Sequence, residues 1–551
     1  MIKRWKILPK KSDDLIEQLL INRKIKKEDW PSFLNPDFEK NLFNPFLMKG
    51  MKEAVKRILQ AISGREIIGL FGDYDADGIP GTALLFNLFK YLGIKTFVYI
   101  PSRKQGYGLN NEGIEYFLLN KVNLIITVDL GVRNIKEIEY AQKLRMEVIV
   151  FDHHEVSKKL PRCIIVDPKQ GGDKYPFREL AATGVVFKLL QALSKHIPKI
   201  SQNYLKWSLD LVAISTICDI VPLISENRIF TKFGLIVLKK TKHIGLKTLY
   251  QKAMITPEKI NTYAVGFQIG PRINAPGRMD HANESFFLLT TTDSKEADKL
   301  ADILDKINRQ RQAELERVLN EARKKVCEAN LQKKKVIIIS EKNWPQGIVG
   351  LVAGRLMEEF ARPVIVCEKQ GSNLRGSARS IEAFDLIAAL DEAKIYLSKY
   401  GGHKKAAGLT LENKHLSGLY DKLLEVADSK LKDEDLTFSI NIDAKLKIKE
   451  INTALINKIK KFEPFGLGNP RPVFILDKIK ISNIRIIGKK SNHLKFKVGN
   501  FEALGFDMGY LANNLVENGD YNIVFTLDED EWNGQKKIQL KIIDIKNTPK
   551  A

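Results

Sequence analysis

Long apolar runs, paired cysteines and an apolar leader segment are all missing from this sequence of 551 residues. No stretch reaches the roughly 18 to 20 apolar residues of a membrane-spanning helix, so we expect no membrane partner. The four cysteines are scattered and form no Cys-x-x-Cys pair, which argues against zinc knuckles and a disulfide framework. Their scatter is typical of the reducing cytoplasm, and no signal-peptide apolar region follows the basic first residues.

The charge is strongly unbalanced toward the positive side. The formal net charge is +23, which is common in proteins that bind nucleic acid or another polyanion. An alternative is that the many lysines reflect genome composition or adaptation to heat. The length allows two to four domains, each with its own core.

The most informative segment is Asp73-Tyr74-Asp75-Ala76-Asp77-Gly78. It follows the apolar run Ile67–Phe71 and precedes the helical pattern that begins near Thr82, which predicts a buried strand, a tight turn and a helix. Three carboxylates on one turn repel one another, and divalent cations are their usual compensation. The segment therefore predicts a metal site at the end of a strand.

Two more apolar runs end in the same kind of residue. Leu124–Val128 leads into Asp129, and Val148–Phe151 leads into Asp152, His153 and His154. Helical patterns at residues 112–120 and 134–144 separate the runs, which indicates a parallel sheet with right-handed crossovers. The carboxyl ends of such strands share one edge, where ligands bind. We therefore expect one crevice to collect these side chains: Asp73, Asp75, Asp77, Asp129, Asp152, His153 and His154.

Asp219 is an acidic residue inside the apolar stretch that begins at Leu209. A buried carboxylate is rare unless it is paired or bound to a metal. A helix cap or a hydrogen bond to the backbone is the alternative. Together with the acids at the strand ends, the metal interpretation is preferred.

Three further patterns organise the rest of the chain. Residues 294–330 predict one long helix, capped by Ser294, that connects two domains. Strand and helix then alternate to about residue 430, and alternating apolar residues after about 435 predict an antiparallel β module. This module fits an OB-fold, although alternation alone does not separate it from another small barrel. The predicted domains are residues 1–45, 46–293, 294–330 (the helix), 331–432 and 433–551.

The ordered motifs resemble the DHH phosphoesterase superfamily and, within it, the bacterial RecJ single-stranded-DNA exonucleases. Besides the acidic motifs, the resemblance rests on Phe33–Pro36, Asn44–Met48, Gly270–Met279, Gly376–Ser380 with Gly401–His403, and Phe462–Pro470. It implies an α/β fold: a parallel-sheet DHH domain, a long helix, a smaller α/β DHHA1 domain, and a C-terminal all-β OB-like module.

The resemblance also implies a metal centre and its cofactor. The implied ligands are Asp75, Asp77, Asp129, His153 and Asp219, with Asp73 as a sixth ligand or a supporting group. Such a set suits two bridged Mn²⁺ or Mg²⁺ ions, and Mn²⁺ is favoured because the family usually works with it. Asp152 is expected to orient an imidazole. His154 is expected to face the scissile phosphate as a donor or proton shuttle.

Substrate binding is expected from the later motifs. The resemblance implies that Arg278, in an arginine-bearing loop, binds a phosphate and that Ser377 and Arg379 form a pocket for the 5′-terminal phosphate. Gly401 and Gly402 would let the backbone approach a nucleotide, with His403 near the active crevice. The alternatives are a plain turn at Gly401–Gly402 and a surface salt bridge at Arg278.

The implied activity is metal-dependent 5′ to 3′ digestion of single-stranded DNA to 5′-mononucleotides, in DNA repair and recombination. The implied partners are single-stranded DNA, the single-stranded-DNA-binding protein and a recombination helicase. Two alternatives stay open. One is a DHH phosphoesterase for short oligonucleotides, cyclic dinucleotides or pyrophosphate, and the other is a non-catalytic replication scaffold.

Overall fold

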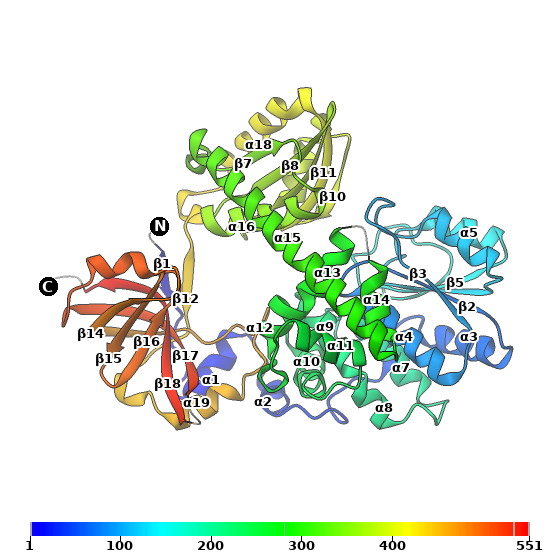
Figure 1. Cartoon of the computed structure of the whole chain (residues 1–551), viewed down its shortest axis with the longest axis horizontal. Coiled ribbons are helices and arrows are strands. Elements are labelled where there is room, and N and C mark those ends of the chain that lie inside the picture. Colours follow the sequence, from blue (N-terminus) through cyan, green and yellow to red (C-terminus); the bar gives the residue numbers. More distant parts are fainter. Residues whose placement is uncertain (1–2, 280–281, 533–534, 549–551) are drawn as a thin grey trace. The chain divides into compact units, whose positions relative to one another are not determined.

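The computed structural model describes residues 3–279, 282–532 and 535–548 (Figure 1). These residues form two compact units. One unit contains Trp5–Asp305 together with the chain from Asn441 onward, and the other contains Lys306–Ile440. Among the residues described, no helix combines the length and apolar character that crossing a bilayer requires.

A five-stranded parallel sheet organises the first unit. Its strand order is β3-β2-β4-β5-β6, and every neighbouring pair is parallel, which confirms the predicted α/β fold. The two edge strands were not predicted from the sequence. One has only three residues and the other has no fully buried residue, so neither carries a strong strand pattern. The strands are β2 (Ile68–Gly72), β3 (Thr96–Tyr99), β4 (Leu124–Val128), β5 (Glu147–Phe151) and β6 (Ile164–Val166).

Helices join these strands and then build the second half of the domain. Helix α3 (Met51–Ser63) precedes the sheet, and the crossover helices are α4 (Gly78–Leu92), α5 (Asn111–Leu119) and α6 (Ile135–Lys143). The helices after the sheet are α7 (Ala182–Leu193), α8 (Gln202–Trp207), α9 (Leu209–Cys218), α10 (Ser225–Leu238), α11 (Ile244–Lys252), α12 (Thr262–Ala264), the π-helix η4 (Val265–Ile269), α13 (Gly270–Arg278) and α14 (Asn283–Thr290). The apolar faces of α4, α7 and α9 are buried against one another, and this core holds α9 beneath the acidic edge of the sheet.

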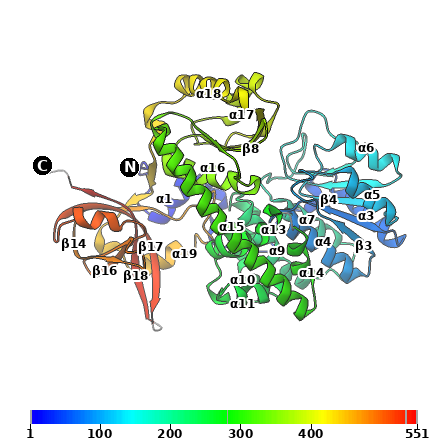
Figure 2. The same cartoon turned by 45° about the horizontal axis from the view of Figure 1, so that its top comes forward.

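One long helix, α15 (Ser294–Glu328), follows (Figure 2). Its 35 residues correspond to roughly 50 Å at 1.5 Å per residue. The predicted helix over residues 294–330 is therefore present almost to the residue.

The second unit contains a mixed five-stranded sheet of order β10-β11-β9-β8-β7. Only β7 and β8 are parallel, because the hairpins β8–β9 and β10–β11 reverse the chain. The elements are β7 (Ile337–Glu341), α16 (Gln346–Phe360), β8 (Val364–Gln370), β9 (Asn373–Arg379), α17 (Leu386–Glu392), β10 (Lys399–His403), β11 (Ala406–Glu412) and α18 (Leu416–Lys430).

The C-terminal strands form a closed barrel, as the OB-fold prediction requires. Pairing runs β14-β15-β16-β18-β17, and β17 pairs back to β14, which closes a five-stranded ring. The strands are β13 (Ala444–Lys445), β14 (Phe474–Ile487), β15 (His493–Val498), β16 (Phe501–Gly505), β17 (Asp520–Trp532) and β18 (Gln535–Asn547), with α19 (Thr453–Lys460) before them. Near the N-terminus lie β1 (Arg4–Ile7), paired with β12 (Ser439–Ile442), α1 (Leu15–Asn22) and α2 (Trp30–Leu34).

A buried arginine joins residues 461–463, which lie between α19 and β14, to the helical part of the same unit. Arg228 on α10 is only 1% exposed. Its guanidinium donates hydrogen bonds to the carbonyl oxygens of Phe33 (2.8 Å) and of residues 461, 462 and 463 (2.7–2.8 Å). Burial lowers the pKa of Arg228 to about 9, so the group stays largely charged at neutral pH. Because no neutral side chain offers that many donors in one plane, only arginine can satisfy this ring of carbonyls.

Candidate metal centre and substrate pocket

The acidic turn lies between the end of β2 and the start of α4, as predicted. The Asp75 carboxylate accepts hydrogen bonds from the backbone N–H groups of Asp77 (2.8 Å) and Gly78 (3.0 Å), which fixes the turn. A Cβ at position 78 would lie 2.7 Å from the Cβ and backbone nitrogen of Asp73, so only glycine lets the helix begin so close to the strand.

Asp77 is buried and held at the N-terminus of α7. Its Oδ1 accepts hydrogen bonds from Thr183 N–H (2.8 Å) and Ser215 Oγ (2.6 Å), and its Oδ2 accepts one from Ala182 N–H (2.7 Å). These contacts fix the orientation of the carboxylate.

His153 presents one ring nitrogen to three carboxylates. Its Nδ1 lies 3.0 Å from the carbonyl oxygen of Leu180, which can only accept, so Nδ1 carries the proton in the neutral ring. Nε2 then faces Asp77 at 3.6 Å, Asp129 at 3.3 Å and Asp219 at 3.7 Å. Burial lowers the pKa of His153, which keeps the imidazole neutral. A lone pair that faces three carboxylates is repelled by all of them unless a cation lies between.

The carboxylates themselves are under-compensated. Asp73 Oδ1 and Asp129 Oδ1 are buried and accept no hydrogen bond from any described residue. Burial raises the pKa values of Asp73, Asp129 and Asp219 well above the usual range, and the charges of neighbouring aspartates raise them further. Orphaned acceptors in a cluster of like charges are the signature of a cation site.

Three overlapping groups of residues could hold a metal ion. Each group brings its ligand atoms within 4.8 Å of one another, and the groups share Asp129 or His153. Apart from His154, the members of these groups are five carboxylates and one imidazole, a donor set that fits Mn²⁺ or Mg²⁺. The groups are Asp73–Asp75–Asp129, Asp77–His153–Asp219 and Asp129–His153–His154. All six predicted ligand residues therefore lie together.

His154 stands apart from the other members in its protonation. Its Nδ1 donates to Asp152 Oδ1 at 2.7 Å. Burial alone would lower the pKa of His154, but the hydrogen bond and charge of Asp152 outweigh burial and raise it to about 9. Asp152 also accepts a hydrogen bond from the backbone N–H of Val132 (3.1 Å), so it is held in place as an orienting group. The Tyr107 hydroxyl lies 3.1 Å from His154 Nδ1 and donates to the carbonyl oxygen of Asp129 at 2.8 Å.

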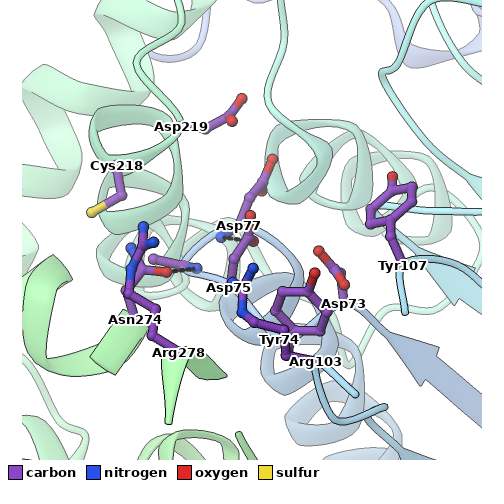
Figure 3. Close-up of a pocket in the computed structure, with 11 residues that line it drawn as sticks. Asp73, Tyr74, Asp75, Asp77, Arg103, Tyr107, Cys218, Asp219, Asn274 and Arg278 are labelled. Atoms are coloured by element: carbon purple, nitrogen blue, oxygen red, sulfur yellow. Dashed lines mark hydrogen bonds between the residues drawn. The ribbon is translucent and has the colours of Figure 1, made fainter. Parts of the chain in front are cut away.

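A pocket of about 290 Å³ opens beside the acids. Figure 3 shows the acidic turn in the middle of this pocket, with Asn274 and Arg278 at one wall and Tyr107 at the other. Arg103 lies over the ring of Tyr74 (4.7 Å) and donates to the carbonyl oxygen of Gly277 at 3.2 Å. Two guanidinium groups thus face a site lined with carboxylates.

Sequence reasoning missed Arg103 and Tyr107. Both belong to the segment between β3 and α5, and β3 was itself missed. A strand at Thr96–Tyr99 would have placed the following loop at the same edge of the sheet as the acids. Asn274, whose Oδ1 accepts from Ala76 N–H at 2.8 Å, stands inside the predicted arginine motif but was not singled out.

The segment Gly270–Met279 is not a loop, so that prediction is wrong. Residues Gly270–Arg278 form helix α13, which continues directly from η4. Pro271 stands at the second position of α13, where the π-helix η4 passes into the α-helix. A Cβ at Gly277 would lie 2.3 Å from the carbonyl oxygen of Tyr74, so this close approach presses the helix onto the acidic turn and brings Arg278 into the pocket.

A second pocket, of about 320 Å³, lies in the second unit. It brings Ser377 of β9 and Gly401 of β10 together across Gly408 of β11, which pairs with both. Arg375 and Lys399 also line it, and these cations were not predicted. Ser377 and Arg379, which were predicted to form a phosphate pocket, lie on a β-strand, because β9 pairs on both sides.

The other three predicted residues of this unit do not line that pocket. Arg379 is partly buried and donates to its own neighbour, the carbonyl oxygen of Ala378 (2.8 Å). A Cβ at Gly402 would lie 2.2 Å from the carbonyl oxygen of Ala406, so its glycine serves the β10–β11 pairing rather than a plain turn. His403 is exposed at the end of β10. The binding roles of these residues stay predictions.

The turn that follows Asp219 is supported by the Phe462–Pro470 motif. Asp219 caps the end of α9, and the N–H of Leu223 donates to the carbonyl oxygen of Leu467 at 2.7 Å. Gly468 has φ +73°, and a Cβ there would lie 3.0 Å from Pro222 Cβ. The motif therefore sets the path of the chain that leaves Asp219.

Comparisons with known proteins agree with this geometry. Models of protein families match residues 67–216 (DHH family, N-terminal domain), 333–433 (DHHA1 domain) and 442–544 (RecJ OB domain). The single-stranded-DNA-specific exonuclease RecJ of Bacillus subtilis is 37% identical over 96% of this chain and 67% of its own length. The protein of the same name from Haemophilus influenzae is 31% identical over 91% of this chain and 92% of its own length.

A solved structure extends the likeness to the whole fold. The crystal structure of RecJ in complex with Mn²⁺ from Thermus thermophilus has a TM-score of 0.84 and 28% identity, covering 100% of this chain and 80% of that one. The resemblance inferred from the ordered motifs is confirmed. The chain belongs to the RecJ family.

Proposed function

We propose that this protein is a metal-dependent exonuclease of single-stranded DNA. The observation that carries the proposal is the convergence of Asp77, Asp129 and Asp219 on the unprotonated nitrogen of His153, within 3.3–3.7 Å. Family membership supports the substrate, since the relatives are named single-stranded-DNA-specific exonucleases. Solved structures of RecJ from Thermus thermophilus with Mn²⁺ and with Mg²⁺ support the cofactor.

The metal ligands are proposed as predicted: Asp73, Asp75, Asp77, Asp129, His153 and Asp219. The overlap of the ligand groups at Asp129 and His153 supports two adjoining ions. Divalent ions held by these residues would lower the pKa of a bound water and would offset the negative charge of phosphoryl oxygens.

The neighbouring side chains position the scissile phosphate and supply a proton. His154, protonated at neutral pH because of Asp152, donates from its ring to a phosphate oxygen or to the leaving oxygen. Asp152 holds the imidazole in that orientation. Arg103 and Arg278, at the pocket wall, offer planar forks that match phosphate oxygens.

The second pocket is proposed to bind the 5′-terminal phosphate. Ser377, Arg375 and Lys399 give it a hydroxyl and two cations, and no atom of a described residue lies within 4 Å of a Cβ built at Gly401, which leaves room for a ligand. Recognition of this end agrees with 5′ to 3′ polarity, release of mononucleotides, and a role in repair and recombination, all of which come from the family resemblance. The single-stranded-DNA-binding protein and a recombination helicase are proposed as partners, and the cytoplasm as the location, on the same ground.

Digestion of a long single-stranded oligonucleotide labelled at either end, with Mn²⁺ and with chelator, tests the proposal. Early release of the 5′ label as a mononucleotide, lost with chelator and absent on blunt duplex, is expected. No digestion with either Mn²⁺ or Mg²⁺ would contradict it. Cleavage of dinucleotides alone would instead assign the small-substrate activity.

A further inference from the structure

The helical stretch Thr262–Arg278 exposes two aromatic side chains on its solvent-facing side. Its inner face is buried through Val265, Ile269 and Ile273. The opposite face of such a helix is normally polar. Here it carries Tyr263 and Phe267, which are 63% and 59% exposed, and their rings stack on each other 4.8 Å apart at 25°.

This aromatic pair is rigidly tied to the acidic pocket. Gly270 lies against α9 so closely that a Cβ there would come within 2.2 Å of Cys218 Sγ, and Cys218 directly precedes Asp219. At its other end the same stretch supplies Asn274 and Arg278 to the pocket wall. Phe267 and Asn274 are seven residues apart, or about 10 Å along a helix, which a few nucleotides of an extended strand would cover.

The local backbone is also unusual. Phe267 lies in the π-helix η4, between α12 and α13. Such one-turn π segments cost stability and are frequent at functional sites. Tyr263 and Phe267, four residues apart, lie next to each other on the outer face, while Val265 and Ile269 stay in the core.

We infer that Tyr263 and Phe267 form a stacking platform for unpaired bases of the strand that enters the acidic pocket. The inference rests on the proposed function, because that function supplies the strand. Unpaired bases are the occupant favoured by continuity with the pocket and by the charge of +23, which favours a polyanion. Every base has an aromatic face, so stacking binds a single strand without selecting its sequence. Paired bases of a duplex cannot use the platform, which adds to strand specificity.

Binding without cleavage tests the platform directly. In the presence of chelator, the affinity of the 551-residue chain is measured for an oligothymidylate of about 12 nucleotides and for an abasic strand of equal length. The variant Tyr263→Ala/Phe267→Ala should weaken binding of the oligothymidylate roughly 5- to 100-fold, as loss of stacking does, and leave the abasic strand unchanged. Tyr263→Trp/Phe267→Trp should bind both strands like the wild type.

Two further variants separate stacking from other effects. Tyr263→Leu/Phe267→Leu keeps apolar bulk without a π face and should behave like the alanine variant. Tyr91→Ala removes a matched exposed tyrosine, which stacks on Tyr204 at 5.1 Å near the far end of α4, and should change nothing. Equal binding of both strands by the wild type, or equal loss of both in the alanine variant, would overturn the inference. So would unchanged DNA binding with a change in oligomeric state, which would assign the pair to a protein contact.

Failure of the proposed function gives a different result. A wild-type protein that discriminates the two strands in chelator but digests neither in Mn²⁺ would retain the platform and lose the nuclease assignment. If the wild type digests single strands and the alanine variant binds the oligothymidylate as tightly as the wild type, the nuclease assignment stands and the platform inference fails.

Discussion

Removal of the metal should destabilise the protein, and the loss should grow with pH. Burial and neighbouring carboxylates raise the pKa values of Asp73, Asp129 and Asp219 above those in the unfolded chain. At a pH between the pKa values of the unfolded chain and those of the folded protein, the folded, chelated protein therefore binds more protons than the unfolded chain. The free energy of unfolding of the chelated protein is highest below the pKa values of the unfolded chain, near pH 4, and falls as the pH rises through the pKa values of the folded protein.

The size of the effect follows from the number of sites. Each ion present at 100 times its dissociation constant adds about 2.7 kcal/mol, so two ions add about 5 kcal/mol. In a unit of this size that corresponds to a rise in Tm of about 5–10 °C. Scanning calorimetry from pH 5.5 to 8.5, with Mn²⁺ and with chelator, should show curves that diverge as the pH rises.

Asp129→Asn isolates the cause. This variant removes one buried charge, so the chelated protein should melt at a higher temperature than the chelated wild type, while the Mn²⁺-dependent rise and the nuclease activity are lost. Asp298→Asn is the matched control, because Asp298 is an exposed partner of Lys252 (2.8 Å). A Tm of the chelated wild type that does not depend on pH, or a full Mn²⁺ effect in Asp129→Asn, would refute the reasoning.

Four other variants test the proton donor and the contacts that support the fold. His154→Gln should lower turnover about 10²- to 10⁴-fold with little change in DNA affinity. Asp152→Asn should move the alkaline limb of the rate profile, which lies near pH 9 in the wild type, to lower pH. Measurement of turnover against pH checks both variants, and an alkaline limb that does not move in Asp152→Asn would contradict the role of Asp152. Arg228→Met should lower the free energy of unfolding by about 3–5 kcal/mol, measured in urea, because buried carbonyls lose a charged donor, and a change below about 1 kcal/mol would contradict it. Gly468→Ala should raise the Mn²⁺ concentration at which the Tm shift is half complete, because the added Cβ at a positive φ would displace Pro222 and, with it, the turn after Asp219. An unchanged Mn²⁺ titration would show that the position of Asp219 does not depend on this contact.

The acidic centre could be predicted because its signal is local. Apolar runs that end in Asp73, Asp129 and Asp152 must be buried strands, and parallel strands bring their ends to one edge. The distances of His153 to the carboxylates could not be predicted, because they depend on the Leu180 carbonyl, which belongs to a distant part of the chain.

The errors have a common physical origin. Glycine and proline at residues 270, 271, 276 and 277 argue against a helix, yet tertiary contacts of Gly270 and Gly277 favour helix α13 over local propensity. Arg375 and Lys399 were missed because their pocket is assembled by a register between strands rather than by a motif. Short edge strands such as β3 carry too few buried residues to give a periodic signal.

The carbonyls that surround Arg228 have a consequence for how the chain can be divided. A cut before the barrel, at a boundary such as residue 433 or 441, would leave this guanidinium in an apolar interior with most of its acceptors gone. A shortened nuclease core should therefore unfold at a lower temperature than the same residues in the intact chain, which should melt the barrel and the parallel-sheet domain in one cooperative step. During evolution the same constraint would act against exchange of the barrel between related proteins, because a new barrel would need carbonyl groups in the same positions around Arg228.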